Sequence, residues 1–327
     1  AENLAGQVFE DALAGDMDGL SAEDAAAVLA DFWAFAEQRS GDNILIRVRG
    51  AQGADGRPLD RDVLEIAGRD RPFLVDSVMG EISAQGFDVI AMFHPIVKMR
   101  RNEAGRRVEE GGRFGAESFI QVHLQPLSGT ARERLRAGVQ ETLEDVRVAV
   151  EDWTDMRAAM DDAISHLESA QTGAPREEVE ESLAFLRWLR DDHFAFLGCR
   201  NYEFDVDADG SLRTREPIVR DDTGKGVLRD PERRVLRRSQ EPARLTPAVE
   251  AFLRGPSPVI VAKGNTKSRV HRRAYMDYIG VKRYREDGAV VGETRFVGLF
   301  TAEAYDQMAR DVPLIRRKVR RVLDKAA

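Results

Sequence analysis

Two segments that precede residue 70 alternate apolar and charged side chains, and this period constrains the fold more than any other feature of the chain. Residues 43–50 place aliphatic side chains at every second position and arginines between them. Residues 62–70 repeat the alternation, with Leu64 and Ile66 on the apolar face. Because successive side chains of a strand point to opposite faces, both segments are predicted to be strands that cover a core with one face.

An amphipathic helix is predicted directly after the second strand, within the stretch Gly68–Ile90. Its apolar positions recur at helical spacing. Asp70 can cap the first turn, Pro72 can occupy that turn without losing a hydrogen bond, and Gly86 can end the helix. The positions that form the apolar stripe are Leu74, Val75, Val78, Met79 and Ile82.

Further strands and a long helix complete this first pattern. Residues 87–99 are predicted to form one long strand, residues 100–116 a loop, and residues 117–126 another strand. A long helix is predicted to begin near Thr130. The order strand, strand, helix, strand, strand, helix predicts an α+β unit, in which helices cover one face of an antiparallel sheet.

The chain of 327 residues is long enough for two globular units. We expect an N-terminal helical segment at residues 1–40, the α+β unit at 41–150 and a helical linker at 151–193. Residues 194–327 are predicted to form a second, mainly antiparallel α+β domain with a C-terminal helix. Within this domain, a β-hairpin is predicted to turn at Asp207–Gly210.

Composition limits the compartment in which the protein is expected and the kinds of partner that it is expected to bind. The formal net charge of -8 gives no general attraction to nucleic acid. The single cysteine, Cys199, excludes an internal disulfide and fits a reducing compartment. No apolar run reaches the roughly 18 residues of a membrane helix, and the N-terminus lacks the features of a signal peptide. We therefore expect a cytoplasmic protein that binds neither membranes nor nucleic acid.

A nucleic-acid-binding module is the less favoured alternative. Basic residues cluster at 229–238 and at 263–273, and Tyr275 and Tyr278 follow the second cluster. Aromatic side chains beside arginines can stack the bases of a single strand. The acidity of the chain and the interleaved acidic residues argue against this alternative. The clusters are interpreted instead as surfaces that pair with acidic surfaces of neighbouring domains.

Motifs for metal, nucleotide and covalent chemistry are missing from the sequence. The five histidines share no metal-ligand spacing with one another or with Cys199. His123 is expected to be a solvated or edge residue on the polar face of its strand. Asp222–Gly226 lacks the spacing of a phosphate-binding loop and is interpreted as a mobile loop. No Gly-x-Gly-x-x-Gly motif opens a helix, so we expect no catalytic residue, metal or cofactor within this chain.

The best candidate site is the entry to the predicted helix. A helix N-terminus carries a positive partial charge that can hold a carboxylate, and Arg69 and Arg71 add to this charge. Asp70 and Asp76 can hold an ammonium group, so an amino acid would find both of its partners here. The alternative is that Asp70 only caps the helix and that the arginines are solvated. The candidate effector-binding residues are Arg69, Asp70, Arg71, Pro72, Phe73, Leu74 and Asp76.

The stretch Gly68–Ile90 resembles the strand-to-helix entry of ACT domains, whose usual form is Asp-Arg-Pro-Gly-Leu. Several segments together resemble the N-terminal region of the large bacterial NAD-specific glutamate dehydrogenases. They include RPFLVDSVMGEI, FLRWLRDDHFAFLGCRNYEF, VHRRAYMDYIGVKRY and VGETRFVGLFTAEAY, in the order of the family. The resemblance implies an ACT-like domain, a helical linker and a PAS-like domain.

This resemblance also implies a non-catalytic segment that regulates the enzyme and builds a homo-oligomer through contacts with the rest of the parent polypeptide. The parent would oxidise L-glutamate with NAD and water to 2-oxoglutarate, ammonia and NADH, and its glutamate and NAD sites would lie outside this sequence. An amino-acid-sensing ACT module is the first alternative. One departure bears on it, because effector-binding ACT domains usually carry glycine where this chain has Phe73. The phenyl ring would fill space that a ligand needs.

Overall fold

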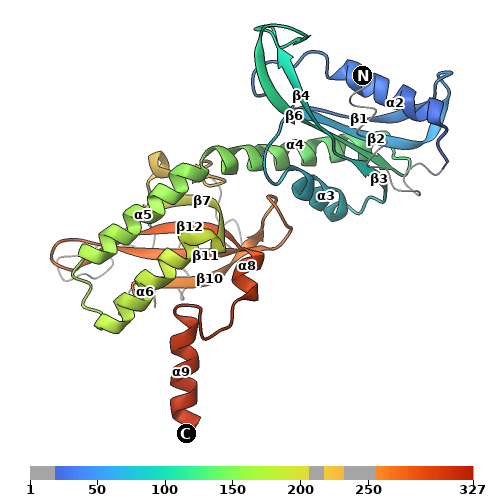
Figure 1. The fold of residues 1–327 in the computed structure, drawn as a ribbon. Coiled ribbons are helices and arrows are strands. Elements are labelled where there is room, and N and C mark those ends of the chain that lie inside the picture. The colour runs from blue at the N-terminus through green and yellow to red at the C-terminus, as the bar shows by residue number, and fades with distance from the viewer. Residues whose placement is uncertain (1–18, 206–216, 232–254, 327) are drawn as a thin grey trace. The chain divides into compact units, whose positions relative to one another are not determined.

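The computed structural model describes residues 19–205, 217–231 and 255–326. The predicted hairpin turn at Asp207–Gly210 lies outside these residues. The described parts of the chain form two antiparallel sheets, each with its own helices (Figure 1).

The chain divides into two compact units, and the boundary between them falls within the long helix α4 (Gly129–Glu151). The first unit comprises Ala1–Val146 together with Arg269–Arg273. The second unit comprises Arg147–Ser268 and Ala274–Ala327. Each unit has its own sheet and its own buried core.

The first unit is built on a six-stranded antiparallel sheet in the order β1-β2-β6-β4-β5, and β3 also pairs with β6. Its strands are β1 (Leu45–Gln52), β2 (Pro58–Arg69), β3 (Val89–Phe93), β4 (Ile96–Arg101), β5 (Arg107–Val108) and β6 (Arg113–Leu124). Ile46 lies opposite Ile66, and Val48 lies opposite Leu64. The two alternating segments therefore pair with their apolar faces in register, and the strands predicted for them are confirmed.

Helices cover both faces of this sheet (Figure 1). They are α2 (Ala22–Phe35), α3 (Leu74–Ala84) and α4. The helices α3 and α4 pack on the face that carries Leu64 and Ile66, whose side chains are buried. On the opposite face, Phe32 of α2 packs edge-on against Phe119 with 5.4 Å between ring centroids. The sequence predicted the first pair of helices on the sheet but not the covering by α2.

A buried polar row lies on the sheet face beneath α2. Two arginines of β1 and the amide of Gln121 donate hydrogen bonds to Glu65. His123 Nε2 donates to Gln121 Oε1 at 3.1 Å, which leaves His123 Nδ1 as an acceptor facing Arg61. His123 is 2% exposed, so the expectation of a solvated or edge histidine is wrong. Burial and the neighbouring Arg61 lower the pKa of His123 to about 4.

The single long strand predicted at residues 87–99 is two strands, β3 and β4, separated by His94 and Pro95. Proline donates no backbone hydrogen bond and restricts the backbone of the residue before it. Both strands still pair with β6, β3 along its C-terminal part and β4 along its N-terminal part. The predicted loop at residues 100–116 is shorter than expected, because β5 and the start of β6 lie within it.

The helix α3 begins later than predicted. Its first residue is Leu74, and the residue that precedes it, Phe73, has φ 69° and ψ 3°. Asp70 does not cap this helix and Pro72 lies before its first turn, so both predictions are wrong. The left-handed backbone region is costly for a residue with a β-carbon, and glycine would adopt it without this cost.

A buried ion cluster is centred on Glu117 of β6. Arg101 donates from Nε and Nη2 to the two carboxylate oxygens at 2.6 and 2.8 Å, and Arg39 Nη2 donates at 2.8 Å. Arg101 also donates to the backbone carbonyls of Ala36 and Glu37, which follow α2. The cluster therefore connects the end of α2 to β4 and β6.

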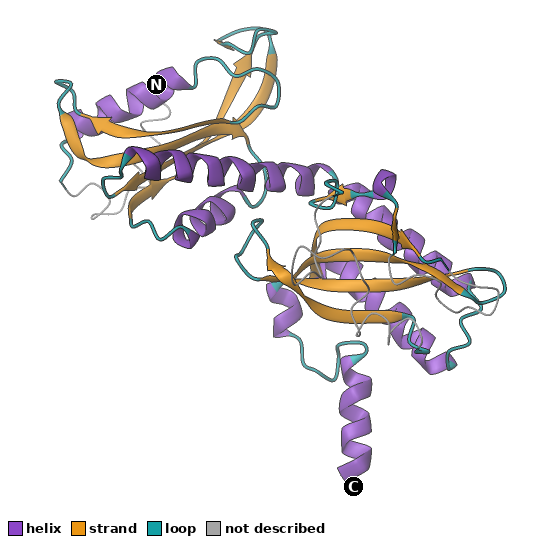
Figure 2. Ribbon diagram, turned by 180° about the vertical axis from the view of Figure 1, so that it is seen from behind, coloured by secondary structure: helices purple, strands orange, loops and turns teal. Residues whose placement is uncertain are grey.

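The second unit is built on another six-stranded antiparallel sheet, in the order β10-β11-β12-β7-β8, and β9 also pairs with β7. Its strands are β7 (Phe194–Glu203), β8 (Ile218–Val219), β9 (Lys225–Gly226), β10 (Val259–Lys267), β11 (Tyr275–Tyr284) and β12 (Val290–Phe300). Figure 2 shows α5 and α6 together on one side of this sheet. Leu186 of α6 packs in one buried cluster with Phe196, Ile279 and Phe296.

The helices of the second unit are α5 (Trp153–Ser169), α6 (Arg176–Trp188), α8 (Ala302–Asp306) and α9 (Ile315–Ala326). The segment Leu189–His193 connects α6 to β7, and its backbone leaves the helical conformation at Asp191 and Asp192. The closing helix predicted after Pro313 is confirmed as α9. The fold class predicted from the sequence, α+β with an ACT-like sheet followed by a PAS-like, mainly antiparallel domain, is also confirmed.

Buried charged groups hold the stretch Asp222–Gly226 and the residues after it. Arg200 is fully buried and donates hydrogen bonds to the carbonyl group of Leu228. Asp152 accepts hydrogen bonds from the backbone N–H of Gly226 at 2.7 Å and from the guanidinium of Arg229. Part of the stretch pairs with the sheet as β9, so its interpretation as a mobile loop is wrong.

We predict that Glu117→Gln destabilises the first unit by about 3 kcal/mol, because it leaves two buried guanidinium groups without a carboxylate. Urea unfolding followed by tryptophan fluorescence measures the loss. Hydrogen bonds from the arginines keep the pKa of Glu117 below 4.5 although burial opposes them. The stabilisation is therefore present above pH 4.5 and is lost as the pH falls through the lower pKa of the folded state. Glu110→Gln, in the exposed hairpin, is the control, and equal stability of both variants would contradict the prediction.

The left-handed backbone at Phe73 gives a second prediction. Phe73→Gly and Phe73→Ala both remove the ring, but only glycine adopts the left-handed region without a steric cost. We expect the glycine variant to be more stable than the alanine variant by about 1 kcal/mol in urea unfolding. Ala137→Gly, at an exposed position within α4, should show the opposite preference, with a loss of about 1 kcal/mol. An alanine variant as stable as the glycine variant would refute the strain at Phe73.

Candidate functional site

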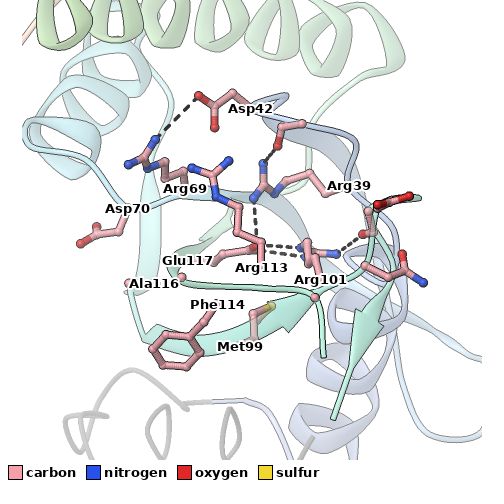
Figure 3. Close-up of a pocket in the computed structure, with 16 residues that line it drawn as sticks. Arg39, Asp42, Arg69, Asp70, Met99, Arg101, Arg113, Phe114, Ala116 and Glu117 are labelled. Atoms are coloured by element: carbon pink, nitrogen blue, oxygen red, sulfur yellow. Dashed lines mark hydrogen bonds and ion pairs between the residues drawn. The ribbon is translucent and has the colours of Figure 1, made fainter. Parts of the chain in front are cut away.

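A cavity of about 840 Å³ opens in the first unit beside the Glu117 cluster. Its walls come from the loop after α2, the end of β2 and the hairpin formed by β4, β5 and β6 (Figure 3). Charged side chains of both signs line it. They are Arg39, Arg69, Arg101 and Arg113, and Asp42, Asp70, Glu103 and Glu117.

The floor of the cavity has a rigid part, formed by Arg101. Its guanidinium donates to both oxygens of Glu117 and to the carbonyl groups of Ala36, Glu37 and Gly105. These five hydrogen bonds use every N–H group of the side chain. Arg101 therefore cannot bind a ligand without breaking contacts that hold the fold.

Arg39 supplies the other part of the floor. Its Nη1 donates to the carbonyl groups of Gly41 at 2.5 Å and Asn43 at 3.2 Å, and its Nη2 donates to Glu117. Arg39 Nε is buried and has no hydrogen-bond partner among the described residues. Because two guanidinium groups share one ionised carboxylate, the floor carries one positive charge in excess, and one N–H group remains unsatisfied there.

The rim of the cavity is also basic. Arg69 lies 3.9 Å from Asp42, and its side chain is 54% exposed. Arg71 donates to the same carboxylate at 3.2 Å. Arg113 forms no ion pair or side-chain hydrogen bond with any residue of the described part of the chain. Figure 3 shows the side chains of Arg39, Arg69 and Arg113 gathered at the same part of the cavity. An anionic group can therefore bind at the rim without displacing a strong internal ion pair.

An apolar wall and acidic groups complete the lining. Met99 and Phe114 contribute the apolar surface, and Phe114 is 57% exposed. Arg100 lies over the phenyl ring at 5.2 Å from its centroid. Asp70 and Glu103 supply negative charge. The cavity thus offers partners for a carboxylate, an ammonium group and an apolar side chain.

Asp70, Ser118 and His94 form a hydrogen-bonded row beside the cavity, but the row lacks the order of a catalytic triad. Ser118 Oγ donates to Asp70 Oδ1 at 2.6 Å and accepts from His94 Nε2 at 3.1 Å. In a nucleophilic triad the histidine takes the proton of the hydroxyl group. Here the proton points to the carboxylate, and Ser118 is 2% exposed. Burial lowers the pKa of His94 although Asp70 raises it. The row positions Asp70 and leaves no accessible nucleophile.

Two of the predicted effector-binding residues, Arg69 and Asp70, line the cavity. The other five predicted residues do not line it. They are Arg71, Pro72, Phe73, Leu74 and Asp76. Leu74 is buried in the first turn of α3, and Asp76 is exposed on the same helix. The structure therefore places the beginning of the predicted stretch at the cavity and the helix entry outside it, and effector binding by these residues stays a prediction.

Sequence reasoning missed Arg39, Arg101, Arg113 and Glu117. Arg39 was assigned only to the end of the N-terminal helical segment, and the stretch from Arg101 to Arg113 was predicted to be a loop. One signal was available for Glu117, because it lies on the same strand face as the large apolar side chain of Phe119. A charged residue at such a position is buried only when it is paired.

Cys199 does not form a catalytic pair with His193. The thiol is buried, and burial raises the pKa of Cys199 to about 12. His193 Nδ1 donates to the carbonyl group of Trp188 at 2.8 Å, and His193 Nε2 accepts from Gln307. Because the thiolate is the reactive form, this cysteine is a packing residue.

The described ranges, residues 19–205, 217–231 and 255–326, contain neither a cluster of metal ligands nor a membrane-spanning helix. No group of three or more histidine, cysteine, aspartate or glutamate side chains in these ranges could hold a metal ion. Within the same ranges, every helix is too short or too polar to cross a lipid bilayer. The cavity beside Glu117 therefore remains the best candidate site of the first unit.

Comparison with known proteins relates this chain to one family. Residues 4–139 match the ACT1 domain of glutamate dehydrogenase. The NAD-specific glutamate dehydrogenase of Halomonas elongata is 35% identical over 267 residues, which are 79% of this chain and 16% of that protein. The enzyme of the same name from Pseudomonas aeruginosa is 31% identical over 272 residues, which are 80% of this chain and 16% of that protein.

A third relative is the NAD-specific glutamate dehydrogenase of Mycobacterium tuberculosis, which is 29% identical over 280 residues, or 80% of this chain and 15% of that protein. A solved RNA-binding light-oxygen-voltage receptor aligns with 9% identity and a TM-score of 0.20, which is too low to indicate a shared fold. The chain spans about 16% of the length of the first two relatives. These findings confirm the resemblance predicted from the sequence: the chain carries a glutamate dehydrogenase ACT1 domain and corresponds to an N-terminal region of the NAD-specific glutamate dehydrogenases.

Proposed function

We propose that this chain is a regulatory, non-catalytic region of a cytoplasmic, homo-oligomeric NAD-dependent glutamate dehydrogenase. The parent enzyme would convert L-glutamate, NAD and water to 2-oxoglutarate, ammonia and NADH. The family relationship and the 16% share of the relatives' length support this proposal. NAD and glutamate would bind in the remainder of the parent polypeptide and not in this region.

The cavity beside Glu117 is the proposed effector site, and its ligand is an amino acid. One observation carries this assignment: positively and negatively charged side chains line the cavity together with an apolar wall. Arg113 and Arg69 would hold the α-carboxylate, because guanidinium groups form charge-assisted hydrogen bonds with carboxylates. Asp70 would hold the α-ammonium group, and the apolar part of the ligand would lie against Phe114.

The ring of Phe73 does not block the proposed site, although the sequence suggested that it would. Its ring was expected to fill the space that a ligand of an ACT domain needs. The cavity is not lined by Phe73, because the charged rim lies at Arg69 and at the β4–β6 hairpin instead of at the helix entry. A ligand at this cavity therefore does not compete with the phenyl ring.

A thermal-shift screen of the L-amino acids, followed by calorimetry, tests the effector site. A ligand at 100 times its dissociation constant should stabilise the chain by about 2.7 kcal/mol. Arg113→Gln should weaken the binding at least tenfold, because a hydrogen bond to a charged group contributes about 1.5–3 kcal/mol. Arg106→Gln, on the same hairpin but outside the cavity, is the matched control.

Two outcomes would contradict this proposal. The effector site is wrong if no amino acid shifts the unfolding transition, or if Arg113→Gln binds the ligand as tightly as Arg106→Gln does. The non-catalytic assignment is wrong if calorimetry shows that the chain alone binds NAD tightly.

A further inference from the structure

An apolar groove of about 540 Å³ lies in the second unit, between α6, β10 and the segment that leads from β12 to α9. Phe185 and Trp188 of α6, Val259 of β10 and Phe300 of β12 line it. Leu314, which precedes α9, also lines it. The groove is bounded by regular structure on both sides and belongs to one compact unit.

Exposed apolar side chains surround this groove and continue along α9. A soluble domain rarely leaves a contiguous apolar surface in water unless a partner covers it. Six large apolar residues of this region are more than two fifths exposed: Val261 (43%), Tyr305 (60%), Met308 (60%), Ile315 (44%), Val322 (66%) and Leu323 (63%). Val261, Tyr305 and Ile315 line the same groove, which distinguishes them from isolated exposed residues that need no explanation.

The helix α9 combines an apolar stripe with a basic surface. Ile315, Val319, Val322 and Leu323 follow the spacing i, i+4, i+7, i+8, which places them on one side of the helix. Between residues 315 and 326 the sequence has six basic residues and one acidic residue. A helix of this composition fits a partner that is apolar along one side and acidic at its edges.

The first turn of α9 already has such a partner within the chain. Arg316 pairs with Glu181 at 2.7 Å, and Arg317 pairs with Glu178 at 2.6 Å, so that α6 holds the base of the helix. Glu181 also accepts a hydrogen bond from the backbone N–H of Leu314. Beyond this anchor, Val322 and Leu323 remain exposed. A helix of 12 residues is marginal by itself in water, so its last turns need a further contact.

We propose that the groove and the apolar stripe of α9 form a docking surface for an acidic amphipathic helix in the remainder of the parent dehydrogenase. This inference rests on the proposed function, because the docking helix would belong to the remainder of a longer parent enzyme. The relatives are about six times as long as the region that this chain matches. A segment of the same polypeptide has a high effective concentration at such a surface.

Charge decides between this occupant and a second copy of the same helix. Two α9 helices side by side would bring their basic residues together, and like charges in contact are unfavourable. An acidic helix from elsewhere in the polypeptide removes that repulsion and satisfies Lys318 and Arg320, both of which are exposed. The pairs that α6 forms with Arg316 and Arg317 show the same complementarity inside the chain.

Hydrogen–deuterium exchange of residues 315–326 tests the docking surface, in the 327-residue chain and in the full-length parent. We expect exchange to be at least tenfold slower in the parent. Val322→Ser combined with Leu323→Ser should restore fast exchange in the parent, and Lys318→Glu should do so in part. Ile218→Ser, at an exposed apolar residue on β8, and Arg176→Glu, at an exposed charge on α6, are the matched controls and should leave the protection unchanged.

Each remaining outcome would overturn the docking proposal. Equal exchange in both proteins would show that nothing covers α9. Dimerisation of the 327-residue chain that is lost on Leu323→Ser, measured by light scattering, would assign the surface to a second copy. Sedimentation of the chain with vesicles of anionic phospholipid, lost in the same variant, would assign it to a membrane surface. Amino-acid binding at the Glu117 cavity is measured separately, so failure of the proposed function does not imitate any of these results.

Discussion

The carboxylate of Glu117 and the guanidinium groups of Arg101 and Arg39 form the interaction on which the first unit depends. A buried carboxylate is stable only when hydrogen bonds and opposite charges replace water. Here three charged hydrogen bonds reach Glu117, and two further N–H groups of Arg101 donate to backbone carbonyls that follow α2. One cluster therefore joins a helix and two strands that are far apart in the sequence. It also gives the neighbouring cavity a positively charged floor.

The apolar core of the fold could be predicted from the sequence, whereas the polar contacts could not. Alternation in residues 43–50 and 62–70 predicted two strands, and their apolar faces pair in register. His123 was misjudged because the same alternation marks its face of β6 as polar, and a polar face is normally solvated. The structure buries that face beneath α2, and a chain of hydrogen bonds from Glu65 through Gln121 satisfies His123. No local pattern encodes which helix covers a polar face.

The residues of the candidate site also fall into a group that the sequence predicted and a group that it did not. Arg69 and Asp70 belong to a continuous stretch whose charges could be read directly, and both line the cavity. Arg39 and Arg113 reach it only through the packing of the helical N-terminus against the β4–β6 hairpin, so sequence distance concealed them. The prediction that Asp70 caps α3 failed for a local reason, because the left-handed backbone at Phe73 delays the start of the helix and Asp70 instead accepts a hydrogen bond from Ser118.

The Glu117 cluster can connect α2 to the sheet and also face a proposed ligand, because Arg101 and Arg39 differ in the number of N–H groups that lack a hydrogen-bond partner. Arg101 has none, so the connection between α2 and the sheet does not need to open for a ligand to enter. Arg39 retains an unsatisfied buried N–H group, and Arg113 lines the rim without an ion pair to any residue that the structure describes. A carboxylate that reaches them would gain hydrogen bonds without removing any from Glu117. Such binding adds to the stability of the hairpin, and it can regulate a parent enzyme only if the hairpin is less ordered in one of the enzyme's states than in another.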